Sequence, residues 1–285
     1  MKTKQYFDDL LDQSISIWLK EDIGDGDHTT FSTIPESTQG KATLIAKEEG
    51  IIAGIFATKK ILNHFDHQLN EKIILPDGSV IRPGDQIMEI SGKVRSILQT
   101  ERLILNVLQR LSGIATQTHN YVQLLEGYKT RILDTRKTTP GFRMLEKEAV
   151  RLGGAINHRF GLFDMILIKD NHIDFAGGIA QAIHSARKYL QHYNKKMEIE
   201  VEARTLDDVK IILEVGDVDR ILLDNFSPEQ TKEAVKLING AVITESSGGL
   251  TKDMIIEYAK CGVDYISVGA LTHHIKSLDL SLKAL

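Results

Sequence analysis

Residues 197–230 read MEIEVEARTLDDVKIILEVGDVDRILLDNFSPEQ, and this stretch decides the expected fold. Two short strand-like runs, at 197–201 and 220–223, are each followed by polar residues and then by a helical pattern. The second helix has a recognisable start, because 227–230 has the pattern of a capping box, with Pro228 at the first helical position. The stretch therefore predicts strand–helix units joined by short loops.

The same unit recurs through the second half of the chain. Further strand-like runs lie at 131–134, 165–168, 241–244 and 264–268, with a possible short strand at 155–156. The last four strands begin roughly 20–25 residues apart, which is the spacing of strand–helix units with short loops. We expect an α/β fold in which about seven parallel strands close a TIM-like barrel slightly smaller than the eight-stranded kind. An open doubly wound sheet is the alternative, although no Gly-x-Gly-x-x-Gly follows a first strand.

The first part of the chain has a different pattern. Apolar residues recur at three- and four-residue spacing over 7–19 and predict a helix. The segment 41–90 contains short strand patterns with turn residues at 76–78 and 82–85, so we expect a small β-rich unit there. A long helix is expected at about 100–125, and we place the domain boundary near its start.

Composition limits the possible classes of protein. The chain has 285 residues and a formal net charge of −4, which gives no overall electrostatic footprint for nucleic acid. A single cysteine, Cys261, excludes a disulfide framework within the chain and a cysteine-based zinc site. The start of the sequence lacks the pattern of a secretory signal, and no stretch approaches the roughly 18 apolar residues of a membrane helix. We expect a cytoplasmic protein with no nucleic-acid or membrane partner.

Unusual residues follow the predicted strands. The carboxyl ends of the strands carry the chemistry of α/β barrels, so the residues directly after each strand are the candidates. They include five cations: Arg136, Lys137, His158, Arg159 and Lys169. Each alone would most simply be a solvated residue or, for the histidine, a structural one. Together at one barrel end they would repel one another unless an anion is bound, so the cluster predicts a pocket for carboxylates or phosphates.

Acids and a glycine-rich loop follow other strands. Glu202 and Asp224 could hold Mg²⁺ against a pyrophosphate, because that ion prefers one or two carboxylates plus substrate oxygens. The alternative is that both acids only complement helix dipoles. The loop 247–249 reads Ser-Gly-Gly before a predicted helix with Thr251 as N-cap, an arrangement typical of a phosphate cradle. Arg102, near the start of the long helix, is either a harmless surface residue or a group that reaches an anion in another subunit.

These motifs resemble those of one enzyme family, the quinolinate phosphoribosyltransferases. The matching segments are 134–141 (DTRKTTPG), 157–159 (NHR), 167–172 (LIKDNH), 222–226 (LLDNF) and 246–249 (SSGG). The resemblance runs from residue 21 to residue 272 and so covers nearly the whole chain. It implies an N-terminal α/β sandwich domain at 1–110, joined by the C-terminal end at 274–285, and a barrel domain at 111–273. It also implies at least a homodimer in which Arg102 completes the neighbouring site.

The resemblance further implies a reaction and the residues that perform it. Enzymes of this family join quinolinate to phosphoribosyl pyrophosphate (PRPP) with Mg²⁺ and no organic cofactor, giving nicotinate mononucleotide, CO₂ and pyrophosphate for NAD biosynthesis. The implied quinolinate pocket comprises Arg102, Thr135, Arg136, Lys137, His158, Arg159 and Lys169. The implied catalytic residues are Lys137, Lys169, Glu202 and Asp224, of which the two acids serve the ribose and the metal–pyrophosphate. The implied 5′-phosphate site comprises Ser247, Gly248, Gly249, Ser267, Val268 and Gly269.

Two alternative functions remain open. A nicotinate phosphoribosyltransferase would bind one carboxylate and would need fewer cations. A non-catalytic relative associated with molybdenum transport would be expected to lose the His-Arg pair at 158–159 or the Lys-Asp-Asn-His motif at 169–172, and both are present here. Offering nicotinate and quinolinate side by side separates the two enzymes.

Overall fold

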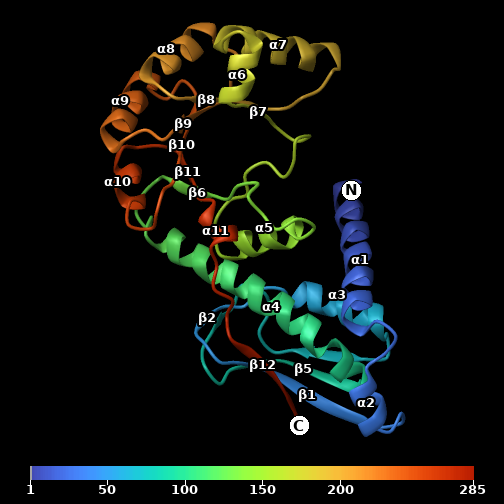
Figure 1. The fold of residues 1–285 in the computed structure, drawn as a ribbon. Helices are drawn as coiled ribbons and strands as arrows, with labels where there is room; N and C mark the ends of the chain where they lie inside the picture. The colour runs from blue at the N-terminus through green and yellow to red at the C-terminus, as the bar shows by residue number, and fades with distance from the viewer. Residues whose placement is uncertain (1) are drawn as a thin grey trace. The chain divides into compact units, whose positions relative to one another are not determined.

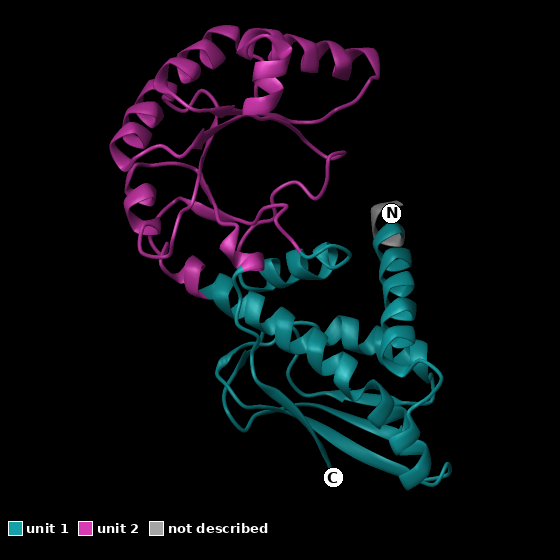
Figure 2. Ribbon diagram, in the orientation of Figure 1, with its two compact units in different colours: residues 1–119, 139–154, 274–285 teal, residues 120–138, 155–273 magenta. Residues whose placement is uncertain are grey.

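The computed structural model describes residues 2–285, with side chains described from residue 6 onward. The chain forms two compact units (Figure 2). Unit 1 comprises residues 1–119, 139–154 and 274–285, and unit 2 comprises residues 120–138 and 155–273. This division differs from the sequence-based boundary after residue 110, because the long helix continues beyond that point and because residues 139–154 return to unit 1.

Unit 1 combines helices with short antiparallel strands (Figure 1). Its elements are α1 (Lys2–Ile23), α2 (His28–Thr33), β1 (Gln39–Ala46), β2 (Gly50–Ile51), α3 (Ile55–Phe65), β3 (Asn70–Ile73), β4 (Val80–Ile81), β5 (Gln86–Lys93), most of α4 (Val94–Gln123), α5 (Arg143–Leu152) and β12 (Leu280–Ala284). The first helix and the β-rich unit agree with the sequence prediction. Helix α4 begins at Val94, earlier than the predicted start near residue 100.

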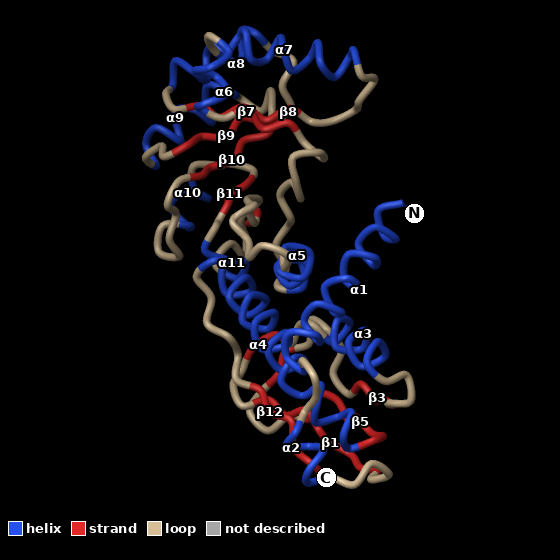
Figure 3. Tube along the Cα trace, turned by 45° about the vertical axis from the view of Figure 1, so that its right-hand side comes forward, coloured by secondary structure: helices blue, strands red, loops and turns tan. Residues whose placement is uncertain are grey.

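The main sheet of unit 1 has the strand order β12-β1-β5-β3 and is antiparallel (Figure 3). The last strand of the chain pairs with β1, so that Leu282 lies opposite Leu44. On the other side of β1, Leu44 lies opposite Met88, and paired residues share a face of the sheet. Leu44 and Met88 are fully buried, so this face carries the apolar core of the unit.

Helix α3 is capped by a carboxylate from a distant segment. Gly54 precedes the helix and has no side chain that could satisfy the first backbone N–H groups. Asp77 does this instead: its Oδ1 accepts from the N–H groups of Gly54 and Ile55 over 2.7 and 2.9 Å, and its Oδ2 accepts from Phe56 over 3.0 Å. The turn at 76–78 therefore holds the start of α3 in place.

Unit 2 repeats strand and helix along the chain, as the sequence predicts. Its elements are β6 (Arg131–Leu133), β7 (Ile166–Ile168), α6 (Asp170–Ala176), α7 (Ile179–His192), β8 (Ile199–Ala203), α8 (Leu206–Val215), β9 (Arg220–Asp224), α9 (Pro228–Ile238), β10 (Ile243–Ser247), α10 (Ile255–Lys260), β11 (Tyr265–Ser267) and α11 (Ala270–His273). The six strands are parallel in the order β6-β11-β10-β9-β8-β7. Helices α6 to α10 lie along the outer side of the curved row of strands (Figure 1).

The predicted strand at 155–156 is present only as a single parallel bridge between Leu133 and Ile156. The Ile156 N–H donates to the Ile132 carbonyl over 3.0 Å, and the Asp134 N–H donates to the Ile156 carbonyl over 3.2 Å. Among the described residues the parallel sheet therefore has six strands, and this bridge lies where the short seventh strand was expected. No helix within residues 2–285 has both the length and the apolar character that crossing a membrane requires.

Candidate active site

The strand register of unit 2 brings charged residues to one face of the sheet. Residues paired across neighbouring strands share a face, and side chains alternate along each strand. Arg220 is paired with Glu200, and Asp224 is paired with Ser247. Glu202 and Glu245 are both in register with Leu222, between these two pairs. We call Glu200, Glu245 and the buried Arg220 the deeper layer, because both acids are fully buried.

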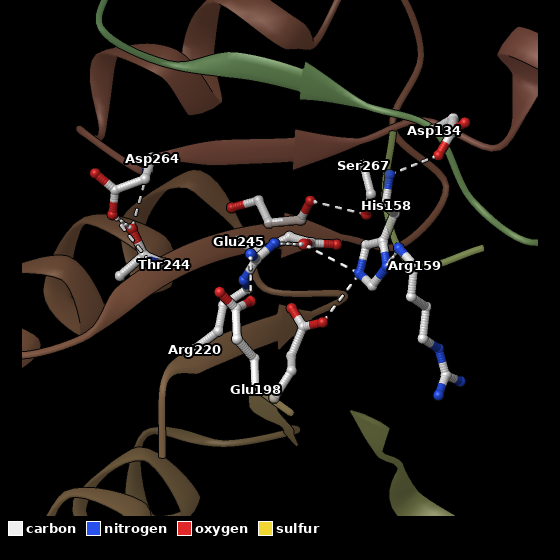
Figure 4. Close-up of polar contacts among 11 residues, drawn as sticks. Asp134, His158, Arg159, Glu198, Arg220, Thr244, Glu245, Asp264 and Ser267 are labelled. Atoms are coloured by element: carbon white, nitrogen blue, oxygen red, sulfur yellow. Dashed lines mark hydrogen bonds and ion pairs between the residues drawn. The ribbon is translucent and has the colours of Figure 1, made fainter. Parts of the chain in front are cut away.

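Asp134 connects the two turns that carry the predicted arginines. It follows β6, it is fully buried, and its Oδ1 accepts the backbone N–H of His158 over 2.7 Å (Figure 4). The next residue, Arg159, donates from Nη1 to the carbonyl of Met165 over 3.2 Å. Burial and, after it, the charge of Arg136 lower the pKa of Arg159. The two arginines are therefore close enough to repel each other, and a bound anion would relieve that repulsion.

Lys137 lies against the turn that follows β11. A Cβ placed on Gly269 would be 3.2 Å from Cδ of Lys137 and 2.7 Å from Nε2 of His273. The hydroxyl of Thr272 donates to the carbonyl of Lys137 over 2.8 Å. The structure therefore brings the lysine beside the predicted phosphate turn at 267–269. It also brings the ring of His273 beside the same turn.

Glu202, Asp224 and Lys169 influence one another at the carboxyl ends of β7, β8 and β9. Burial and then the charge of Asp224 raise the pKa of Glu202, whereas the charge of Lys169 opposes this rise. Lys169 is exposed, and its backbone N–H donates to Nδ1 of His172 over 3.0 Å at the start of α6. The structure thus brings these three predicted residues together. Two neighbouring carboxylates with one lysine can accommodate a divalent cation together with phosphate oxygens.

The loop at 247–249 approaches the turn after β9 so closely that only glycine fits at position 248. Gly248 has φ of +108°, and a Cβ there would be 2.7 Å from the backbone nitrogen of Asn225. The same Asn225 N–H donates to the carbonyl of Ser247 over 2.9 Å, which holds the two segments together. Gly249 also has positive φ, at +58°, but it faces open space. The loop therefore presents backbone without side chains, as a phosphate site requires.

The predicted N-cap at Thr251 is wrong. Helix α10 begins at Ile255 and its N-cap is Met254. The carbonyl of Thr251 instead accepts the N–H of Met254 over 3.0 Å in a turn. Two successive glycines with positive φ direct the chain into this turn before a helix can begin. Any phosphate held by the loop would therefore be bound by backbone N–H groups and not by a helix N-terminus.

A buried histidine–carboxylate cluster forms the deeper layer (Figure 4). Nε2 of His158 lies 2.9 Å from Oε2 of Glu200 and 3.5 Å from Oε2 of Glu245. The guanidinium of Arg220 lies 3.7 Å from Oε2 of Glu245 and stacks over the ring of Tyr265 at 5.0 Å. The His158, Glu200 and Glu245 side chains are 7%, 0% and 1% exposed. Charges buried to this extent are stable only when they are paired.

Two effects act in opposite directions on the ring of His158. Burial lowers its pKa, but the contacts with Glu200 and Glu245 outweigh burial and raise it to about 9. The backbone N–H of Arg159 donates to Nδ1 over 2.7 Å, which disfavours a second ring proton. Because Nδ1 accepts this bond, the proton of the neutral ring is on Nε2, which lies 2.9 Å from Glu200 and 3.5 Å from Glu245. Burial and then Glu245 raise the pKa of Glu200 to about 7.

The sequence predicts that His158 contacts a substrate, which stays a prediction, but it did not identify the two acids near the histidine ring. The structure shows both ring nitrogens of His158 already engaged by protein groups. A pattern for finding Glu200 was available, because acids at 198, 200 and 202 alternate with apolar residues in β8 and directly before it. Alternation puts such residues on one face, and two of these three acids are buried.

The remaining predicted residue, Arg102, lies on α4 in unit 1 and is exposed. Its role stays a prediction. A cavity of about 350 Å³ in the same unit is lined by other residues, among them Trp18, Arg110 and Phe142. In unit 2 a cavity of about 340 Å³ is lined by Arg159 together with residues of β7, α6 and α7.

Comparisons with known proteins cover almost the whole chain. Residues 27–112 match the family of quinolinate phosphoribosyl transferase N-terminal domains, and residues 114–283 match the corresponding C-terminal domains. A chloroplastic nicotinate-nucleotide pyrophosphorylase (carboxylating) from Arabidopsis thaliana is 43% identical over 284 residues, which cover 94% of this chain and 81% of that protein. A probable enzyme of the same name from Bacillus subtilis is 43% identical, over 92% of this chain and 89% of its own length. The solved structure of the nicotinate-nucleotide pyrophosphorylase from Francisella tularensis matches with a TM-score of 0.91 at 42% identity, over 97% of this chain and 96% of that one. The chain therefore belongs to the quinolinate phosphoribosyltransferase family.

Proposed function

We propose that this protein transfers the phosphoribosyl group of PRPP to quinolinate and releases CO₂ and pyrophosphate, giving nicotinate mononucleotide for NAD biosynthesis. Family membership supports the reaction class. The observation in the structure that carries the substrate assignment is the pair Arg136 and Arg159, since burial and, after it, the charge of Arg136 lower the pKa of Arg159. A dianionic ligand would balance such a pair, and planar guanidinium groups match carboxylates in geometry.

The substrate pocket would combine both arginines with Lys169, Lys137 and Thr135. Quinolinate carries two carboxylates and PRPP carries several more negative charges, so cations must offset the repulsion between the two reactants. Holding them side by side removes much of the entropic barrier to their reaction. The hydroxyl of Thr135 accepts the Lys137 backbone N–H over 3.0 Å, and this contact shapes the turn that presents the lysine.

The chemistry would begin at C1 of the ribose. As the C1–O bond to pyrophosphate breaks, the leaving group takes the electron pair and positive charge develops on the ribose, where the carboxylate of Glu202 can stabilise it. The ring nitrogen of quinolinate then donates its electron pair to C1. The resulting pyridinium withdraws electrons from the 2-carboxylate, so the bond to CO₂ breaks and its electron pair stays on the ring carbon, which then takes a proton.

Glu202 and Asp224 would hold Mg²⁺ with the pyrophosphate of PRPP. The fit rests on the raised pKa of Glu202, which shows that burial and Asp224 both disfavour its charge in the absence of a cation. A divalent ion there would offset part of the negative charge of the two acids and of the leaving group when bound. Ser247, Gly248, Gly249 and the turn at 267–269 would hold the 5′-phosphate through backbone N–H groups.

We also propose that the protein is a cytoplasmic homodimer, in which Arg102 of the neighbouring subunit completes each active site. Three apolar side chains of unit 2 are strongly exposed in the isolated chain: Leu162 by 73%, Phe163 by 62% and Phe175 by 92%. Apolar groups exposed to this extent favour coverage by another chain.

Co-expressing Arg102→Ala with Lys169→Ala should restore part of the activity that each variant lacks, because a mixed dimer has one intact site. No recovery would contradict the shared site.

The decisive experiment mixes purified protein with quinolinate, PRPP and Mg²⁺ and follows nicotinate mononucleotide, CO₂ and pyrophosphate. Equal amounts of all three products are expected. Nicotinate in place of quinolinate should give little turnover, and preferential use of nicotinate would favour the monocarboxylate enzyme instead. Absence of product from either acid would support a non-catalytic relative.

A further inference from the structure

The buried layer of charge beneath the proposed pocket has no assigned role in the reaction. In parallel α/β barrels the interior is usually filled by branched apolar side chains from alternate strands. Here the same positions hold Glu200, Glu245 and Arg220, all at most 10% exposed. Burying charge is unfavourable unless each group is paired, so these residues call for a reason beyond packing.

A continuous set of short contacts leads from the two acids to a predicted substrate-binding side chain. Nε2 of His158 lies 2.9 Å from Oε2 of Glu200 and 3.5 Å from Oε2 of Glu245. Its Nδ1 accepts the backbone N–H of Arg159 over 2.7 Å, so the orientation of the ring fixes the peptide that joins the two residues. The His158 backbone N–H is held in turn by Asp134 over 2.7 Å.

We propose that Glu200 and Glu245 are positioning residues that act through the His158 ring to fix the backbone at Arg159, and so the place where its guanidinium meets a carboxylate of the substrate. This inference rests on the proposed function, because it assigns Arg159 to the quinolinate pocket. Two acids are needed because a single contact would leave the ring free to turn about the axis of that contact. With Glu200 on β8 and Glu245 on β10, the ring is held from two separate strands.

A metal ion is not needed to explain the cluster, although these three side chains have ligand atoms within 4.8 Å of one another. Because Nε2 carries the ring proton, it has no lone pair with which to bind a metal ion. Arg220 also supplies positive charge, 3.7 Å from Glu245 and 3.2 Å from Glu198. His158 and Arg220 therefore offset part of the charge of the two acids.

Glu200→Gln and Glu245→Gln test the inference because they preserve size while removing charge. If the acids acted only by long-range electrostatics, removing a negative charge beneath the pocket would strengthen quinolinate binding and lower its KM. If they position Arg159, quinolinate KM rises, by up to about 10²-fold for a displacement of about 1 Å, while KM for PRPP changes far less. The readouts are steady-state kinetics for each substrate and calorimetric binding of quinolinate.

Thr244→Val is the matched control. Thr244 neighbours Glu245 on β10 but points to the opposite face, where its hydroxyl donates to Asp264 over 2.7 Å. It is equally buried, so its loss should lower the melting temperature without changing quinolinate KM. A raised KM in either folded acid variant, with the control unchanged, supports the proposal. An unchanged or lowered KM in the folded variants overturns it.

The unmodified protein provides a test that does not depend on variants folding. In spectra of protein with ¹⁵N-labelled histidine, His158 should show a protonated Nε2 that exchanges slowly with water. A rapidly exchanging or unprotonated Nε2 would mean that the acids do not hold the ring, and would overturn the proposal. Absence of turnover by the wild-type protein would instead refute the proposed function. The spectrum would still show whether the two acids hold the ring of His158.

Discussion

Replacing Gly248 by alanine tests the proposed phosphate loop through its geometry. The new Cβ would be 2.7 Å from the backbone nitrogen of Asn225, which cannot rotate away, so the loop itself must shift. Its φ of +108° adds strain of about 1–3 kcal/mol for any residue with a side chain. A displacement on the order of 1 Å in a positioning segment lowers activity by about 10²-fold. We therefore expect KM for PRPP to rise by about that factor, measured at saturating quinolinate.

Gly84→Ala is the control for strain alone. Gly84 has a similar φ of +94°, but a Cβ there would meet nothing within 4 Å. This variant should lose about 1–3 kcal/mol of unfolding free energy, from urea titration, and keep its PRPP kinetics. If Gly248→Ala and Gly84→Ala have the same KM for PRPP, the close approach of the loop to Asn225 has no bearing on phosphate binding, and the reasoning fails.

Three further predictions concern charged groups. Lys169→Ala should lower kcat/KM for quinolinate by orders of magnitude without moving the urea midpoint, because the side chain is exposed; near-normal kinetics would refute its role. Glu146→Gln should lower the unfolding free energy, measured by urea titration, by about 3 kcal/mol, because the fully buried carboxylate lies 2.6 Å from Arg110. The double variant Arg110→Met/Glu146→Leu should recover most of this loss. A double variant as unstable as the single one would contradict the prediction. Glu200 has a pKa of about 7 in the folded state against an ordinary value of 4.5, so its protonated form favours the folded state. This contribution, on the order of 3 kcal/mol, is complete below pH 4.5 and is lost as the pH rises through 7. If the unfolding free energy of Glu200→Gln depends on pH as steeply as that of the wild type, this prediction is wrong.

Local patterns were sufficient for the elements that depend on neighbours in the chain. The capping box of α9 forms as predicted, with Gln230 N–H donating to the Ser227 hydroxyl over 3.2 Å and Ser227 N–H donating to the Gln230 side chain over 2.9 Å. Strands β6 to β11 all overlap the runs expected from the sequence, to within a few residues. The residues after these strands were also identified as candidates, because the carboxyl ends of parallel strands meet at one edge.

Where local pattern misled, a contact from elsewhere or an unrecognised turn was responsible. Thr251 has the side chain of an N-cap, but two glycines with positive φ turn the chain before a helix can begin. The start of α3 shows no cap in its own sequence, because Asp77 supplies one from a later turn. His158 belongs to a motif typical of substrate binding, yet its ring is oriented by acids that lie more than 40 residues further along the chain.

The sequence alone therefore determined the order of strands and helices, the family and the set of charged candidates, since these follow from periodicity, capping and short motifs within a few residues. Only the tertiary structure decided which candidates meet. Strand register placed Arg220 beside Glu200 and Asp224 beside Ser247, and a shift of one residue would turn each side chain to the opposite face. That register depends on packing between segments far apart in the chain, which no local pattern contains.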